Sequence, residues 1–460
     1  MKKIILIALL IFPIIISAQE AGKSYSFSIK QAQQYAIDNN KTLKNSKIDV
    51  DIAKKQLWQV IAKGLPQVSG TIDYTTYFNY SMSLGLGGGS SFSPTPEQMA
   101  VLDAGDLALL QLLGSTMGGG TEIKMKDAAN AKIQVSQLLF SGEYILGIQM
   151  SKIAQMLVDI NNEKSVLDIK ESVTNTYYSS LIIQKSIEIL DANIENLDQT
   201  LTKTQALFNT GMIEETGVDQ LKMTISGLRS SKSALLRNAE LNLNLLKLQL
   251  SLNPDDVITL TENFDDVFGS IDFSKVLDNT FDINDNVNMR LLEKQENLFE
   301  RQVALKRWAY SPTLAGAYNH TEKLMKTDFD MNPKNLFALQ LSIPIWSSGD
   351  RKAAVDEQRL ELLKVRNNRE IVSDQLLLQE KQLKFNLASA LEQYSIQKEN
   401  VALATKIYNN TELKFRQGVA SSFDLIQANT SLLQAQSSFI TSGMELLQAK
   451  LAFDKLINNI

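Results

Sequence analysis

The sequence has no cysteine and only one histidine among its 460 residues. The lack of cysteine excludes disulfides, thiolate metal sites, cysteine nucleophiles and a lipidated N-terminal cysteine. His320 alone leaves little basis for histidine catalysis or a histidine metal centre. We find no matched set of nucleophile, base and orienting residue, so we expect a protein that is not an enzyme and needs no cofactor or metal.

Excess charge is also small. The formal net charge is -5, and charged residues make up 21% of the chain against 44% hydrophobic residues. This composition is that of an ordinary folded protein and lacks the basic surplus that nucleic-acid binding requires. We therefore expect no nucleic-acid partner.

Long hydrophobic runs are scarce, and the clearest one lies at the N-terminus. Lys2 and Lys3 precede an apolar run at 4–16, and small residues follow at Ser17 and Ala18. The run is roughly 13 residues, whereas a membrane-spanning helix needs about 20. We expect residues 1–19 to be an export signal. No later run is apolar enough for a membrane helix, so a place in the membrane would require strands.

Two similar halves make up the rest of the sequence. Pro66 and Pro312 each end an amphipathic helix and open an alternating stretch. Further on, Leu139-Phe140-Ser141-Gly142 resembles the segment that ends at Ser348-Gly349. Phe208-x-x-Gly211 resembles Phe415-x-x-Gly418 in the same way. Because these matches keep their order, we predict a duplication, with repeats at 20–250 and 285–460 and a mixed segment at 251–284 between them.

Each half contains two stretches in which apolar and polar residues alternate. They lie at about 67–80, 128–140, 313–323 and 336–346. A period of two predicts strands with one apolar face, and each stretch has the length of a tilted membrane strand. A sheet over a soluble core alternates in the same way. The export signal and the lack of a membrane helix favour the membrane interpretation.

Between the strands and the chain ends, helical patterns dominate. The stretches 142–208 and 349–415 hold almost no helix-breaking residue, and each predicts a rod of roughly 100 Å. The final helix carries a heptad repeat through Leu425, Leu432 and Phe439, which predicts a coiled coil. The fold class is therefore mainly α with a β-barrel part.

Four strands are too few for one chain to close a barrel. Known barrels begin at about eight strands, and unpaired strand edges in lipid cost several kcal/mol for each polar group. Three chains supply twelve strands, so we expect a trimer with a twelve-stranded transmembrane barrel. The polar coiled-coil helices would then extend from the membrane as a periplasmic tunnel.

Across essentially the whole mature chain, the sequence resembles the TolC family of outer-membrane efflux proteins. The Pro66 and Pro312 junctions and the two Phe-x-x-Gly segments carry this resemblance. It implies a homotrimer in the outer membrane with most of the chain in the periplasm. It also implies docking to a periplasmic adaptor protein and an inner-membrane pump, for efflux of small molecules or secretion of polypeptides.

The resemblance also implies a periplasmic gate after the Phe-x-x-Gly segment of the second half. Its residues are Phe415, Gly418, Asp424 and Gln427. The family's second gate aspartate is replaced here by Gln427, and its latching arginine by Ala420, so the charge and latch should differ.

In the first half, the matching positions of the gate are Phe208, Gly211 and Gly217, with Asp219 nearby. A ring of three Asp424 carboxylates would attract cations. A helix cap after Ser421-Ser422 is the simpler role for Asp424, and both roles are compatible.

A periplasmic coiled-coil adaptor without a pore is the alternative to a channel. Adaptors also contain long helical hairpins. The two pairs of membrane-length strands argue against this alternative.

Overall fold

The computed structural model describes residues 23–78, 80–84, 103, 105–106, 121–124, 126–325 and 333–460. The predicted signal at residues 1–19 lies outside this range. The chain forms two compact units. The first contains Met1–Val50, Val158–Glu293 and Asn368–Ile460, and the second contains Asp51–Leu157 and Lys294–Asn367.

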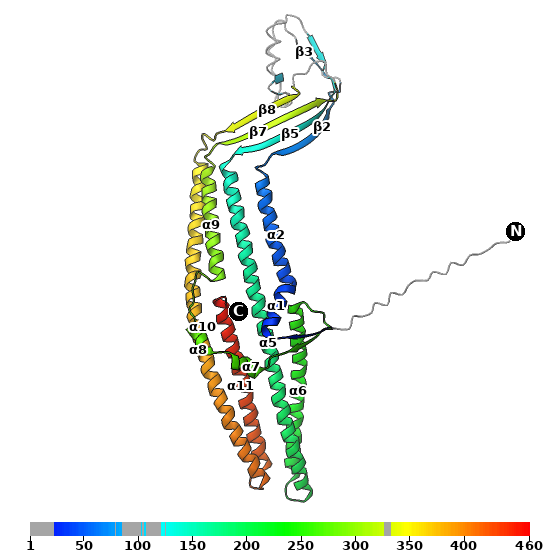
Figure 1. Ribbon diagram of the computed structural model, residues 1–460, viewed down its shortest axis with the longest axis vertical. Coiled ribbons are helices and arrows are strands. Elements are labelled where there is room, and N and C mark those ends of the chain that lie inside the picture. Colours follow the sequence, from blue (N-terminus) through cyan, green and yellow to red (C-terminus); the bar gives the residue numbers. More distant parts are fainter. Residues whose placement is uncertain are drawn as a thin grey trace, which may run out of the picture. The chain divides into compact units, whose positions relative to one another are not determined.

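A four-stranded antiparallel sheet belongs to the second unit and lies at one end of its helices (Figure 1). Its strands are β2 (Gln67–Thr75), β5 (Ala128–Phe140), β7 (Thr313–Lys323) and β8 (Asn335–Ser342). The order β2-β5-β7-β8 pairs the two halves of the chain through β5 and β7. β2 and β8 therefore each leave one edge unpaired within the described residues. A separate ladder joins β3 (Ser81–Leu84) to β4 (Thr121–Lys124).

The register of the sheet separates an apolar face from a polar one. Val68, Val135, Tyr318 and Phe337 form one row across the four strands. Because side chains of a row share a face, the apolar positions of all four strands lie together. The large exposed side chains of this face are Val68, Ile72, Tyr74, Ile133, Tyr318, Phe337, Leu339 and Leu341, each at least 43% exposed.

Both edge strands end earlier than the alternation predicted. β2 ends at Thr75, before a turn in which Phe78 has a positive φ of 47° and the Tyr80 N–H donates to the Tyr77 carbonyl (2.9 Å). β8 ends at Ser342. Pro344 follows, which has no N–H to continue a ladder. The alternation of apolar and polar residues continues past both strand ends, because it reflects which way the side chains face. The bounds of a strand are instead set by hydrogen bonds between backbones.

Helices account for most of the structure, in the same order in each half. The first half has α2 (Lys41–Ala62), α5 (Gly142–Asn209) and α6 (Glu215–Leu250); the second has α9 (Val287–Trp308), α10 (Asp350–Arg416) and α11 (Ser422–Leu456). α5 has 68 residues and α10 has 67, so each is about 100 Å long. Among the described helices, none combines the length and apolarity that a membrane crossing requires.

A small mixed layer lies against the long helices of the first unit. It contains β1 (Ser24–Phe27), α1 (Ile29–Asn39), β6 (Val257–Leu260), α7 (Phe264–Ser270) and α8 (Phe273–Asp278). β1 pairs in parallel with β6, a partner for the 251–284 segment that the sequence did not reveal. The buried Tyr177 hydroxyl of α5 donates to the Phe27 carbonyl (2.9 Å) and fixes this layer on the helix.

Candidate functional site at the helical hairpin tips

The turn between α10 and α11 is built by the second Phe-x-x-Gly segment. Gly418 has a φ of +74°, a conformation that favours glycine. Its N–H donates to the Phe415 carbonyl (3.0 Å), and the Val419 N–H donates to the Lys414 carbonyl (2.9 Å). This pair of bonds is a Schellman cap. The Phe415 ring is buried in a cluster with Leu425, which holds the two helices together.

The turn between α5 and α6 repeats this geometry. Gly211 has a φ of +73° and donates to the Phe208 carbonyl (2.8 Å), while Met212 donates to the Leu207 carbonyl (3.0 Å). The spacing of phenylalanine and glycine thus encodes a helix end. Its glycine accepts the left-handed conformation that lets the chain reverse.

Asp424 lies in the first turn of α11 as part of a reciprocal capping box. Ser421 is the cap residue itself, and its hydroxyl accepts the Asp424 N–H (3.2 Å). The Asp424 carboxylate accepts the Ser421 N–H (2.9 Å) and hydroxyl (2.7 Å). These bonds from Ser421 lower the pKa of Asp424. Asp424 therefore acts from the third helical position rather than as the cap residue, and its side chain is exposed.

The other predicted gate residues have different surroundings. Gln427 is exposed one turn after Asp424. Asp219 is exposed and pairs with Lys222 of its own helix (3.2 Å), so the two aspartates have separate partners. Gly217 is buried, and a Cβ at this position would lie 2.6 Å from the Ser422 Oγ. The first turns of α6 and α11 therefore meet at the tips.

Large apolar side chains are exposed at the same end, a feature that the sequence analysis did not single out. Met212, Val419 and Phe423 are 73%, 75% and 63% exposed. They lie in or beside the two turns, so the hairpin tips present an apolar surface. The signal in the sequence was the apolar residue that directly follows each turn glycine.

The predicted junctions near the sheet each have a local explanation. Pro66 directly precedes β2, and the Gln67 side chain donates to the Ala62 carbonyl at the end of α2 (2.7 Å). Pro312 directly precedes β7. Gly349 has a φ of +87° one residue before α10 begins. Gly142 opens α5 against the Trp308 ring.

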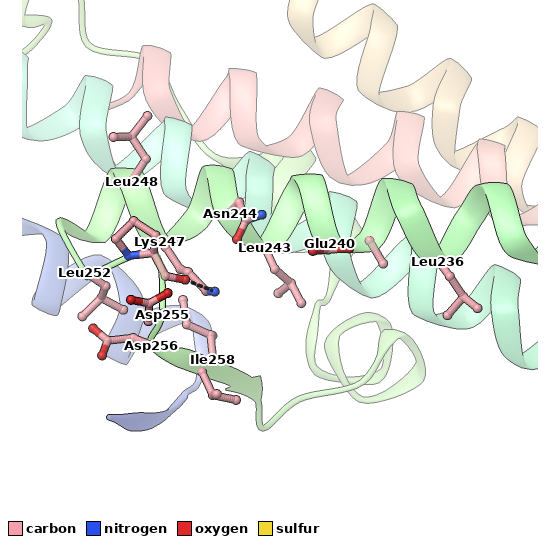
Figure 2. Close-up of a pocket in the computed structure, with 13 residues that line it drawn as sticks. Leu236, Glu240, Leu243, Asn244, Lys247, Leu248, Leu252, Asp255, Asp256 and Ile258 are labelled. Atoms are coloured by element: carbon pink, nitrogen blue, oxygen red, sulfur yellow. Dashed lines mark hydrogen bonds between the residues drawn. The ribbon is translucent and has the colours of Figure 1, made fainter. Parts of the chain in front are cut away.

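A hollow of about 820 Å³ lies between α6 and the segment that leads into β6 (Figure 2). Leu236, Leu243 and Leu248 supply apolar walls, and the Lys247 Nζ donates to the Pro254 carbonyl (2.8 Å). Asp256 binds the backbone N–H of Lys23 (2.8 Å) and is committed to structure. The lining contains no histidine and no nucleophile–base pair. Among the described residues, no cluster of carboxylates and histidine suits a metal ion.

Comparison with solved structures identifies the fold. CusC, whose crystal structures concern folding and transmembrane channel formation, matches with a TM-score of 0.71 at 14% identity, over 94% of this chain and 92% of that chain. The outer membrane protein VceC of Vibrio cholerae matches with 0.70 at 12% identity, over 93% and 95%. The CmeC outer membrane channel of Campylobacter jejuni matches with 0.68 at 15% identity, over 94% and 85%. The fold is that of outer-membrane channel proteins.

Part of the sequence also matches a family model. Residues 283–459 match the model of the outer membrane efflux proteins. No curated protein sequence matches the chain. The second half carries the family's sequence pattern and the described chain carries its fold, which confirms the predicted resemblance to the TolC family of outer-membrane efflux proteins.

Proposed function

We propose that the chain is one subunit of a passive outer-membrane duct, and that three copies pool their strands into a twelve-stranded barrel. The observation that carries this proposal is the sheet of β2, β5, β7 and β8. It exposes a continuous apolar face and leaves the β2 and β8 edges unpaired. An apolar exposed face suits lipid, and a polar opposite face suits a water-filled lumen.

The proposed closure of the barrel follows from the free-energy cost of unpaired strand edges in lipid. Each unpaired backbone amide or carbonyl in hydrocarbon costs several kcal/mol. When β8 of one copy pairs with β2 of the next, three copies satisfy every edge. A ring of this kind repeats one interface between two different surfaces of the subunit.

The long hairpins then form a periplasmic tunnel that serves as the exit duct of a tripartite efflux or type I secretion system. Energy comes from an inner-membrane pump, and a periplasmic adaptor links pump and duct. The exposed Met212, Val419 and Phe423 support this arrangement, because an apolar surface at the tips suits a protein partner.

The gate belongs at the same tips. Asp424 and Gln427 are exposed on the first turns of α11, and the lowered pKa of Asp424 keeps its carboxylate charged at neutral pH. Three such carboxylates around a narrow axis attract cations. Phe415, Gly418 and their counterparts Phe208 and Gly211 fix the turns on which the gate is built. Gly217 holds the two hairpins close at this level, and Asp219 adds a second carboxylate on α6.

The decisive experiment is the mass of the protein extracted from isolated outer membranes with a mild detergent. Light scattering, with the detergent contribution subtracted, should give the mass of three chains. A monomer, or a protein that washes off without detergent, would contradict the pooled barrel and favour a soluble periplasmic adaptor.

A further inference from the structure

A cluster of four cations lies where the second half of the chain passes between its helices and the sheet. Its members are Lys306 and Arg307 in the last turn of α9, and Arg351 and Lys352 in the first turn of α10. The Arg351 guanidinium lies over the Tyr310 ring, 5.8 Å from the ring centroid, so the two helix ends are neighbours (Figure 1). Because the chain as a whole has a formal net charge of -5, this basic cluster is a local exception.

The cations of this cluster have no anionic partner in the chain. None of the four forms an ion pair with any residue that the structure describes. Asp350 is the only acidic residue in the segments 306–312 and 346–352, and it is exposed. The cluster therefore keeps a surplus of positive charge that an outside anion can satisfy.

Helix electrostatics explain only one half of the cluster. Cations in the last turn of a helix complement its dipole, which accounts for Lys306 and Arg307. Arg351 and Lys352 lie in a first turn, where the dipole favours anions and opposes cations. An anion at this place would be stabilised by both side chains, and also by the backbone N–H groups that a first turn leaves without helical acceptors.

The first half of the chain builds the same junction without such a cluster. Counted from the matching proline and glycine, the counterparts of the four cations are Val60, Ile61, Tyr144 and Ile145. There the Tyr144 hydroxyl donates to the Ile61 carbonyl (2.8 Å), and its ring lies so close to Gly64 that a Cβ there would come within 2.3 Å. A junction of helix and strand thus forms without these cations, and their role lies outside the fold of the junction.

The surroundings of the cluster suit a lipid. Between β8 and α10, Ile343, Ile345 and Trp346 are 58%, 90% and 83% exposed. Ile343 and Ile345 continue the alternation that defines the apolar face of β8, and Arg351 and Lys352 follow Trp346 five and six residues later. The order apolar, aromatic, cationic matches one leaflet of a bilayer from its hydrocarbon through its interface to its phosphates.

We infer that the cation cluster binds the phosphate of an anionic phospholipid in the periplasmic leaflet of the membrane. A guanidinium stacked on a ring, as Arg351 is on Tyr310, can present its N–H edge to two phosphate oxygens. Lys306, Arg307 and Lys352 add positive charge around it. The site rests on the proposed function, because it requires the sheet to lie in lipid, and it adds the class of lipid that the chain selects.

Tryptophan fluorescence tests this site, because Trp308 and Trp346 flank the cluster and the chain has only three tryptophans. The full mature protein is reconstituted in phosphatidylcholine vesicles that contain a brominated lipid, either phosphatidylglycerol or phosphatidylcholine. Bromine quenches a tryptophan that its lipid contacts, so quenching against the brominated fraction gives the relative binding of the two lipids. The wild type should bind the anionic phosphatidylglycerol at least about tenfold more strongly.

Neutral variants on the two helices test the four cations. Arg351→Gln with Lys352→Gln should lower the preference for phosphatidylglycerol by about tenfold. Lys306→Gln with Arg307→Gln, on the other helix, should also lower it, and removal of all four cations should abolish it. The two pairs are independent, so the test does not depend on the folding of one variant.

Arg359→Gln with Lys364→Gln is the matched control on α10. It removes the same two kinds of charge, but these cations already pair with Asp356 and Glu361. The control should keep the preference of the wild type. Equal binding of both lipids by the wild type, or a preference that survives the loss of all four cations, would overturn the site. Quenching by neither lipid would reject the proposed function itself, because the sheet would then lie outside the bilayer.

Discussion

Gly142 lies directly against the indole ring of Trp308, so that a Cβ on Gly142 would come within 2.1 Å of the Trp308 Cε3. The first residue of α5 thereby meets the last residue of α9. The junction between strand and helix in the first half of the chain is thus locked by the second half. A small residue is required there for packing, in addition to any need for a turn.

Replacing Gly142 by alanine should destabilise the protein by about 2 kcal/mol, because the ring and the backbone must separate. Gly147→Ala is the matched control in the same helix, since its Cβ would find only Val60 at 3.9 Å. That change should stabilise by about 0.5–1 kcal/mol. Thermal unfolding in detergent measures both, and equal effects would contradict the steric explanation.

The left-handed cap at Gly418 predicts a graded response to substitution. Gly418→Ala should cost about 1 kcal/mol, since an L-residue is strained at a φ of +74°. Gly418→Asn should cost less, because asparagine tolerates this conformation. Unfolding temperatures of the two variants provide the test; an alanine variant as stable as the asparagine one would argue against the cap.

Asp454 is buried beside Lys450, so the folded protein should lose stability when either partner is removed. Burial raises the pKa of Asp454, while Lys450 opposes that shift, and burial together with Asp454 raises the pKa of Tyr178 to about 12. Removing the cation by Lys450→Ala should cost about 3 kcal/mol. Lys364→Ala, which breaks an exposed pair with Glu361, should change stability by less than about 0.5 kcal/mol.

The same pair predicts a dependence on pH. Because the folded-state pKa of Asp454 is raised, its protonation favours the folded state. The contribution of Asp454 to the free energy of unfolding is largest below about pH 4, and it declines as the pH rises through the raised pKa. In Lys450→Ala the decline should extend to higher pH, which unfolding temperatures measured across the acidic range will detect. An unchanged profile would contradict the pairing.

If the proposed gate is correct, Asp424→Ala should weaken the cation preference of the channel in single-channel recordings, because it would remove the proposed ring of three carboxylates. Ser421→Ala is the control, since it breaks the cap and keeps the charge. The pKa of Asp424 is lowered, so its charge and its capping bonds persist at neutral pH and are lost only as pH falls through that lowered value. Unchanged selectivity in Asp424→Ala would leave it only the capping role.

Adjacent residues of β8 lie on opposite faces of the sheet, which the proposed barrel would turn toward lipid and toward the lumen. Leu339→Arg places a charge on the apolar face and should cost about 2–4 kcal/mol in a bilayer. Gln340→Arg, on the polar face of the same strand, should be tolerated. The yield of folded trimer in isolated outer membranes measures the difference, and equal yields would contradict a membrane sheet.

Features that depend on near neighbours along the chain could be predicted from the residues alone. Alternation in the 313–323 and 336–346 segments defined which faces of β7 and β8 are apolar. The Phe-x-x-Gly spacing marked both hairpin turns, because a helix end is set within about six residues. The heptad through Leu425 and Leu432 marked the buried side of α11, where both are buried.

Contacts between segments that are distant in the sequence became visible only in the folded chain. Nothing near residue 24 signals that β1 pairs with β6, and nothing near Gly142 signals Trp308. The early end of β2 at Thr75 and the meeting of Gly217 with Ser422 likewise depend on contacts with distant segments. Side-chain patterns record which way each residue faces, whereas pairing and close approach depend on which remote segment the packed chain brings to that face.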